Sequence, residues 1–92
     1  MSKKIAVDFD GTLCEYAFPK IGNQTLEQKK LLEILIELKK EGHKIILWTN
    51  RGDNDQYKVL TEAIDWCRSK GLEFDAINEN LPDQKKDLWL QS

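Results

Sequence analysis

The sequence predicts an α/β fold in which three parallel strands alternate with two helices. Two short, continuously apolar runs have the length of buried strands, and a third, less apolar run follows them. Two segments with the apolar spacing of amphipathic helices lie between these runs. A β-α-β-α-β order with short connections favours right-handed crossovers and a single parallel sheet, and we expect a Rossmann-like three-layer sandwich.

The first strand is expected over residues 4–9, an apolar run that carries Asp8 to its tip. Residues 10–23 have no regular apolar spacing, and Pro19 and Gly22 interrupt them. This segment is therefore expected to form a loop.

The first helix is predicted to begin at Thr25, because Thr25 and Gln28 have the spacing of a capping box. Gly42 has the conformational freedom to end it. The apolar stripe consists of Leu31, Ile34, Leu35 and Leu38.

A second buried strand is expected over residues 45–48, before polar residues with turn chemistry. The second helix should end at Gly71, and a third strand, nearer an edge of the sheet, should follow over 72–77. Three residues are candidates to cap the second helix: Asp53, Asn54 and Asp55.

Composition and charge suit one globular domain over residues 1–92. The formal net charge of -2 gives no electrostatic footprint for nucleic acid. The first apolar run is too short for a signal sequence or a membrane span, so the cytoplasm is the expected compartment. Cys14 and Cys67 lack metal-ligand spacing, and we interpret them as unpaired packing thiols.

Chemically active residues gather where the first two strands end. The carboxyl ends of parallel strands share one edge of a sheet, and ligands bind there. A strand period of two puts Asp8 and Asp10 on the same side and directs Phe9 away from them, toward packing. Two carboxylates ~4 Å apart repel each other by about 4 kcal/mol at an effective dielectric near 20, which favours a bound cation such as Mg²⁺. The residues expected at this edge are Asp8, Asp10, Gly11, Thr12, Thr49, Asn50 and Arg51.

Other residues of this edge suit a phosphate group. Gly11 allows close approach of the backbone, while Thr12 and Thr49 supply hydroxyl donors. Arg51 either clamps a substrate phosphate or caps a turn. The same two roles are open for Asn50.

Two aromatic residues of the loop, Tyr16 and Phe18, either line a substrate loop or complete the core. We favour the core, because aromatic side chains in a short chain are usually needed there.

The segment DFDGTL, residues 8–13, resembles the first motif of the haloacid dehalogenase (HAD) superfamily. The segment ILWTN, residues 46–50, resembles its second motif, an apolar strand that ends in Thr or Ser. Residues 5–80 are similar to a small capless subgroup of phosphatases in that superfamily.

The resemblance implies a Mg²⁺-dependent phosphohydrolase, a phosphomonoesterase for a small-molecule or accessible phosphate ester. Asp8 would attack phosphorus and form an aspartyl phosphate. Asp10 would protonate the leaving oxygen and later activate water, and Thr49 would hold a phosphoryl oxygen. Mg²⁺ would bind the Asp8 carboxylate and the Asp10 backbone carbonyl.

The resemblance is incomplete towards the C-terminus. Lys85 or Lys86 is the candidate for the third-motif lysine, and we assign Lys86 to phosphate binding. No pair of acids follows a later apolar strand, so the fold is expected to be HAD-like but C-terminally truncated. The first strand would then have an unpaired edge, and we expect a homodimer through it or a cover formed by residues 88–90.

Two other classes of function remain open from the sequence. One is a degenerate, non-catalytic module that binds phosphate or metal. The other is an interaction protein that pairs a partner chain along the exposed sheet edge.

Overall fold

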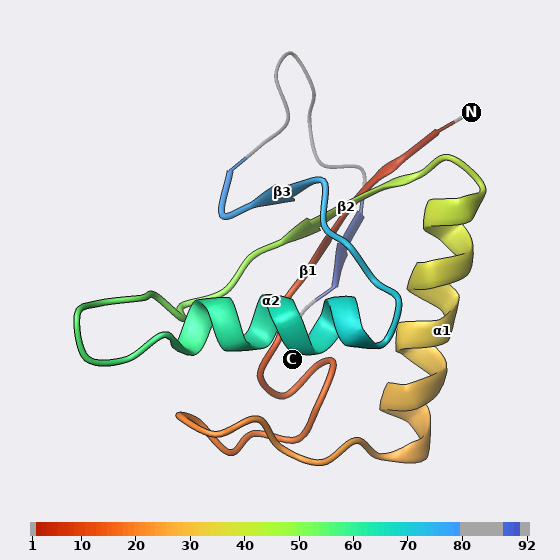
Figure 1. The fold of residues 1–92 in the computed structure, drawn as a ribbon. Helices are drawn as coiled ribbons and strands as arrows, with labels where there is room; N and C mark the ends of the chain where they lie inside the picture. The colour runs from red at the N-terminus through yellow and green to blue at the C-terminus, as the bar shows by residue number, and fades with distance from the viewer. Residues whose placement is uncertain (1, 80–87, 91–92) are drawn as a thin grey trace.

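The computed structural model describes residues 2–79 and 88–90. It contains a four-stranded sheet with the order β3-β2-β1-β4, in which every neighbouring pair of strands is parallel (Figure 1). No helix in these ranges is long and apolar enough to cross a membrane. The elements are β1 (Lys4–Val7), α1 (Leu26–Lys40), β2 (Lys44–Leu47), α2 (Val59–Ser69), β3 (Ala76–Ile77) and β4 (Leu88–Leu90).

The predicted α/β class and the order of the first five elements are confirmed. The third strand is shorter than expected, Ala76–Ile77 rather than residues 72–77. Asp75 explains its late start, because the Asp75 carboxylate accepts the Ile45 N–H at 2.8 Å. A side chain therefore takes the place of the backbone carbonyl that would continue the ladder. A salt bridge of 2.8 Å from Lys39 also holds this carboxylate.

The expectation of an unpaired edge on β1 is wrong. Strand β4 lies along it in parallel, with Ile5 opposite Leu88 and Val7 opposite Leu90. The alternative in which residues 88–90 cover this edge is thus confirmed. A homodimer stays a prediction, but exposure of the β1 edge no longer supports it.

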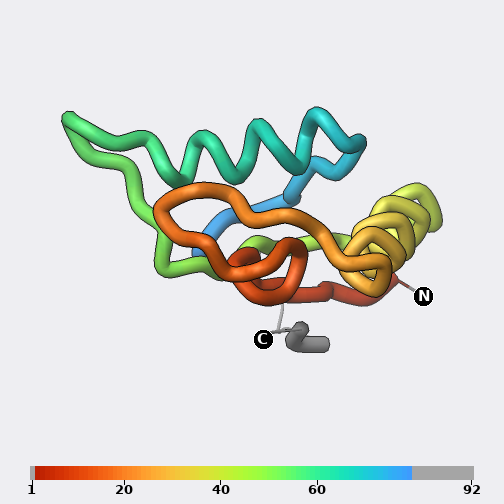
Figure 2. The backbone as a smooth tube through the Cα atoms, turned by 90° about the horizontal axis from the view of Figure 1, so that it is seen from below, coloured from red at the N-terminus to blue at the C-terminus, as the bar shows by residue number. Residues whose placement is uncertain are grey.

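Both helices lie on the same face of the sheet, as Figures 1 and 2 show together. The strand order explains this arrangement, because the β1-α1-β2 and β2-α2-β3 crossovers proceed in the same direction along the sheet. Right-handed crossovers that proceed in one direction place their helices on one side. Within the described ranges the structure therefore has two layers rather than the three that we expected.

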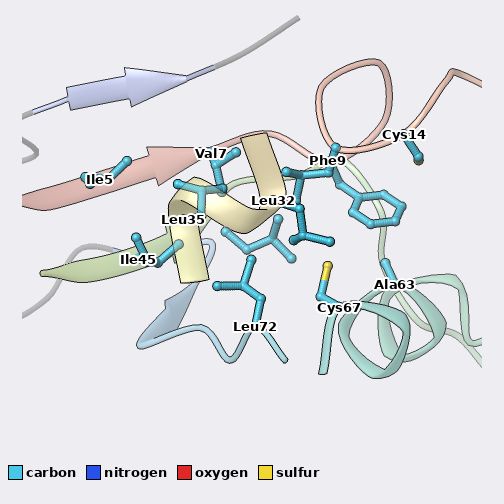
Figure 3. Close-up of a cluster of buried hydrophobic side chains, with 12 residues drawn as sticks. Ile5, Val7, Phe9, Cys14, Leu32, Leu35, Ile45, Ala63, Cys67 and Leu72 are labelled. Carbon is cyan, nitrogen blue, oxygen red and sulfur yellow. The ribbon is translucent and has the colours of Figure 1, made fainter. Parts of the chain in front are cut away.

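The core lies between this face and the two helices. Side chains from β1, β2, α1 and α2 converge there (Figure 3). Alternate strand residues enter it, for example Ile5 and Val7 of β1, as a strand period of two requires. Cys14 and Cys67 are buried and unpaired, which confirms the packing interpretation of both thiols.

Side-chain hydrogen bonds cap both helices. Thr25 accepts the Gln28 N–H at 3.1 Å and donates its own N–H to the Gln28 side chain at 2.9 Å, so the predicted capping box is present. At α2, Asp53 accepts the Leu60 and Thr61 N–H groups at 2.9 and 3.1 Å. Hydrogen bonds from the side chain and backbone of Thr61 lower the pKa of Asp53. Of the three candidate caps, Asp53 is the one that binds the helix.

The loop between β1 and α1 closes on itself at Gly22. The Glu15 N–H donates to the Asn23 carbonyl at 2.7 Å. A Cβ atom on Gly22 would lie 2.0 Å from the Glu15 carbonyl oxygen, a distance that no side chain tolerates. The crossing of the loop therefore requires glycine at this position.

Substitution of Gly22 by alanine should lower the free energy of unfolding by about 1–3 kcal/mol, because the loop must shift to relieve the overlap. Urea unfolding followed by circular dichroism measures the change. Gly52→Ala is the matched control, since a Cβ there meets nothing within 4 Å. Equal midpoints for the two variants would contradict the close approach.

Neither cysteine should react with a thiol reagent in the native protein. Burial raises the pKa of Cys67 to about 12 and also raises the pKa of Cys14, so both stay protonated near neutral pH. Titration with an aromatic disulfide reagent should show both thiols only after unfolding. Rapid labelling of one thiol in native buffer would disprove this.

Candidate active site

Asp8 and Thr49 follow the ends of the neighbouring parallel strands β1 and β2, at the same edge of the sheet. The Trp48 N–H donates to the Val7 carbonyl at 2.9 Å, so the two strands stay in register up to these residues. Asp8 is half-buried, and its carboxylate accepts the Phe9 N–H at 2.8 Å. This is the sheet edge at which the sequence predicted a site.

Phe9 points into the core, as the strand period predicted. It is completely buried and packs edge-on against the Trp66 ring, with the ring centroids 5.6 Å apart. Figure 3 shows the ring among the core side chains. Phe9 therefore anchors the segment that carries the two acids.

A tight turn follows the acids. Gly11 has a φ of 83°, a conformation that glycine adopts without strain, and its N–H donates to the Cys14 carbonyl at 2.9 Å. The Thr12 and Leu13 N–H groups both donate to the Phe9 carbonyl. The Thr12 hydroxyl, by contrast, is buried and has no hydrogen-bond partner among the residues described. Because buried polar groups are normally paired, this hydroxyl is an exception among the described residues.

Arg51 occupies the centre of the site. Its side chain is only 1% exposed and forms a bidentate pair with Asp10, in which Nε donates to Oδ2 at 2.9 Å and Nη2 to Oδ1 at 2.8 Å. The guanidinium also donates to the backbone carbonyls of Pro19 at 3.3 Å, Lys20 at 2.9 Å and Val59 at 3.0 Å. The hydrogen bonds with Asp10 raise the pKa of Arg51.

This geometry favours a positioning role for Arg51 over a phosphate clamp. A guanidinium has five N–H donors, and the two Asp10 oxygens and three carbonyls accept all of them. No donor remains for a phosphate unless one of these bonds breaks. The sequence left open a phosphate clamp or a turn cap, and the structure shows a third arrangement, in which Arg51 links Asp10 to the carbonyls of Pro19, Lys20 and Val59.

Arg51 also offsets the repulsion expected between the carboxylates of Asp8 and Asp10. The sequence suggested that a cation keeps Asp8 and Asp10 ionised together. In the structure the cation beside the Asp10 carboxylate is Arg51 itself. The expectation that both carboxylates face one metal ion is therefore not supported.

Thr49 is fixed on both sides. Its hydroxyl oxygen accepts the Arg51 N–H at 3.1 Å, and its own N–H donates to the Asn78 side chain at 2.8 Å. Asn78 has a φ of 55° and donates its N–H to the Leu47 carbonyl at 2.7 Å. Among the described residues no acceptor takes the Thr49 hydroxyl proton, so this hydroxyl can donate to a ligand.

The sequence analysis did not include Asn78 in the site. The available signal was an asparagine directly after the third strand, because asparagine is among the few residues that tolerate a positive φ.

The remaining predicted residues are distributed differently. Asn50 is exposed beside this edge. Lys86, like Lys85, lies outside the described residues. The core interpretation is wrong for the loop aromatics, because Tyr16 is 73% and Phe18 46% exposed. Phe18 instead lies over the Arg51 guanidinium, 5.2 Å from its ring centroid.

The donor set at this edge fits a weakly held Mg²⁺ ion. The described ranges contain no group of three His, Cys, Asp or Glu side chains that could hold a metal ion. Mg²⁺, however, usually takes only one or two protein carboxylates and completes its octahedron with water and substrate phosphate oxygens. The Asp8 carboxylate and the Asp10 backbone carbonyl, the two ligands implied by the HAD resemblance, meet that requirement.

Fold and site together define a small α/β protein with a candidate acidic site at the carboxyl ends of its central parallel strands. A solved structure of a conserved protein coded by a locus from Bacteroides thetaiotaomicron is similar, with 38% sequence identity and a TM-score of 0.82 over 99% of this chain and 76% of that chain. The chain belongs to the same family as that protein. A scan against protein-family models and a search of curated proteins gave no match.

Replacement of Arg51 by methionine should lower the free energy of unfolding by about 3–5 kcal/mol, because it leaves a partly buried carboxylate and three carbonyls without their partner. Urea unfolding measures the loss. Arg68→Met is the matched control: the Arg68 side chain is 58% exposed and pairs on the surface with Asp65 and Glu73, so its change should stay within about 0.5 kcal/mol. Similar losses in both variants would show that the Asp10 pair is unimportant.

Proposed function

We propose that the protein is a Mg²⁺-dependent phosphohydrolase that cleaves phosphate monoesters through an aspartyl phosphate. One observation supports this most strongly. Asp8 directly follows the central strand β1, Thr49 lies two residues beyond the end of the neighbouring strand β2, and in the turn after Asp8 the Thr12 hydroxyl has no hydrogen-bond partner among the described residues. A nucleophilic carboxylate and two hydroxyl donors are suited to a tetrahedral phosphoryl group.

In the first step an Asp8 oxygen attacks phosphorus, and the bond from phosphorus to the ester oxygen breaks. The leaving oxygen takes a proton from Asp10 and departs as the alcohol. In the second step water attacks the aspartyl phosphate and gives its proton to Asp10. Inorganic phosphate leaves, and Asp8 returns to its initial state.

The chain's own residues supply position and donors for these steps. Arg51 holds the Asp10 carboxylate by two hydrogen bonds, and each oxygen keeps a second lone pair for proton exchange. The Thr49 hydroxyl donates a hydrogen bond to a phosphoryl oxygen. The Asn78 side chain fixes Thr49 by accepting its backbone N–H. When bound by Asp8 and the Asp10 backbone carbonyl, Mg²⁺ supplies charge neutralisation for the phosphoryl oxygens.

The test is an assay of phosphate monoesters with Mg²⁺ that compares the native chain with Asp8→Asn. The variant keeps the shape of the side chain but lacks the nucleophile, so we expect the rate to fall at least about 10³-fold. Asp55→Asn is the matched control, because Asp55 is an exposed acid of the loop after β2. Equal residual rates in Asp8→Asn and the native chain would exclude the mechanism.

A non-catalytic phosphate- or metal-binding module is the second candidate. It is favoured by the occupancy of both Asp10 oxygens by Arg51, which restricts their use in proton transfer. Calorimetric titration with Mg²⁺ and phosphate separates the two. Binding that depends on Asp8 without any turnover would identify the module.

A further inference from the structure

A cavity of about 410 Å³ opens beside the candidate active site. Its lining includes Asn50 and Gly52, which flank Arg51 in sequence, and Val59, whose carbonyl accepts an Arg51 N–H. Phe18 also lines it and stacks on the Arg51 guanidinium. Two residues of the lining, Phe18 and Val59, therefore contact the same guanidinium that pairs with Asp10. The volume of the cavity lies within the range of small-molecule pockets, about 300–1,000 Å³.

The wall opposite Phe18 is a preformed turn that presents Tyr57. The Asn54 carboxamide oxygen accepts the Gln56 and Tyr57 N–H groups, each at 2.8 Å, and the Asn54 N–H donates to the Tyr57 carbonyl at 2.8 Å. Asp53 ties the same segment to the start of α2. Tyr57 is 61% exposed although its backbone is fixed in this way. An exposed aromatic ring on an ordered turn, facing a pocket, is suited to ligand contact.

The chemistry of the lining defines the ligand. All the described residues that line this cavity are uncharged: Phe18, Pro19, Asn50, Gly52, Asn54, Tyr57 and Val59. An ionised group placed there would lose water without gaining a counter-ion. Two aromatic rings and a proline favour a flat apolar group instead.

A larger cavity of about 700 Å³ lies on another side of the same loop, but it is a poorer candidate. It shares Pro19, Tyr57 and Val59 with the smaller cavity, but neither Asn50 nor Gly52 contributes to it. Its lining also carries two acids, Glu62 and Asp65, against one lysine, Lys20. Two acids would repel a phosphate ester. The smaller cavity thus has both the right location and the right charge.

We propose that the cavity between Phe18 and Tyr57 binds the organic part of the substrate and selects phosphate monoesters with a neutral aromatic group. The inference rests on the proposed phosphohydrolase function and adds the substrate class to it. The phosphoryl group would lie at Asp8, and the aromatic group would extend past Arg51 into the cavity.

Three esters of similar size test the selection: benzyl phosphate, cyclohexylmethyl phosphate and 4-carboxybenzyl phosphate. All are esters of primary alcohols, so differences in rate report on the pocket rather than on the leaving group. We expect kcat/KM to be highest for benzyl phosphate and lower for the aliphatic and the charged ester. Tyr57→Ala should lower kcat/KM for benzyl phosphate by about two- to tenfold and leave that for cyclohexylmethyl phosphate nearly unchanged.

Tyr16→Ala is the matched control, because Tyr16 is 73% exposed and does not contribute to the lining of this cavity. It should not alter the preference. An equal loss on all three esters in Tyr57→Ala, or no loss, would overturn the selection while leaving the phosphohydrolase function intact.

A binding experiment covers the outcome in which no ester is cleaved. Benzylphosphonate, which cannot be hydrolysed at its P–C bond, is titrated into the protein in the presence of Mg²⁺, with cyclohexylmethylphosphonate as comparison. Tighter binding of the benzyl compound that weakens in Tyr57→Ala would support the pocket even if catalysis fails. Equal or undetectable binding of both would reject it.

Discussion

The pairing of Arg51 with Asp10 is the interaction on which the site depends. Removing a charged guanidinium from water is costly unless every donor finds an acceptor. Here the acceptors come from three separate segments: the turn after β1, the loop at Pro19 and Lys20, and the first residue of α2. If one segment moves, the others lose a partner as well. A single buried cation thus ties together segments that lie far apart in the sequence.

The same pairing sets the charge of the active-site edge. Without Arg51, an incoming phosphate dianion would meet two carboxylates. The ion pair offsets the charge of Asp10, so Asp8 is the carboxylate at this edge that Arg51 does not pair with in the structure. Both Asp10 oxygens are oriented by hydrogen bonds of 2.8 and 2.9 Å, so proton exchange at Asp10 has to use the second lone pair of an oxygen that already accepts from Arg51. Arg51 therefore contributes to the proposed reaction without touching the substrate.

Features that depend on local sequence were predictable. The capping box at Thr25 and the inward direction of Phe9 follow from spacing alone, and both are confirmed. Features that depend on distant partners were not. Arg51 is held by Asp10, which lies 41 residues away in the sequence. The start of β3 is set by a hydrogen bond that the Ile45 N–H donates to the Asp75 carboxylate. No periodicity in a single sequence encodes such pairs.

The exposed loop aromatics show why the core interpretation failed there. A short chain normally needs its aromatic side chains for packing, yet Phe18 gains contact area by stacking on the guanidinium and leaves its other face to the cavity. One ring then serves both the ion pair and the pocket wall. Phe18, which contacts the side chain that positions the proposed catalytic acid, thus also contributes to the surface that we propose selects the substrate. The proposed preference for aromatic esters follows from this double role of the Phe18 ring.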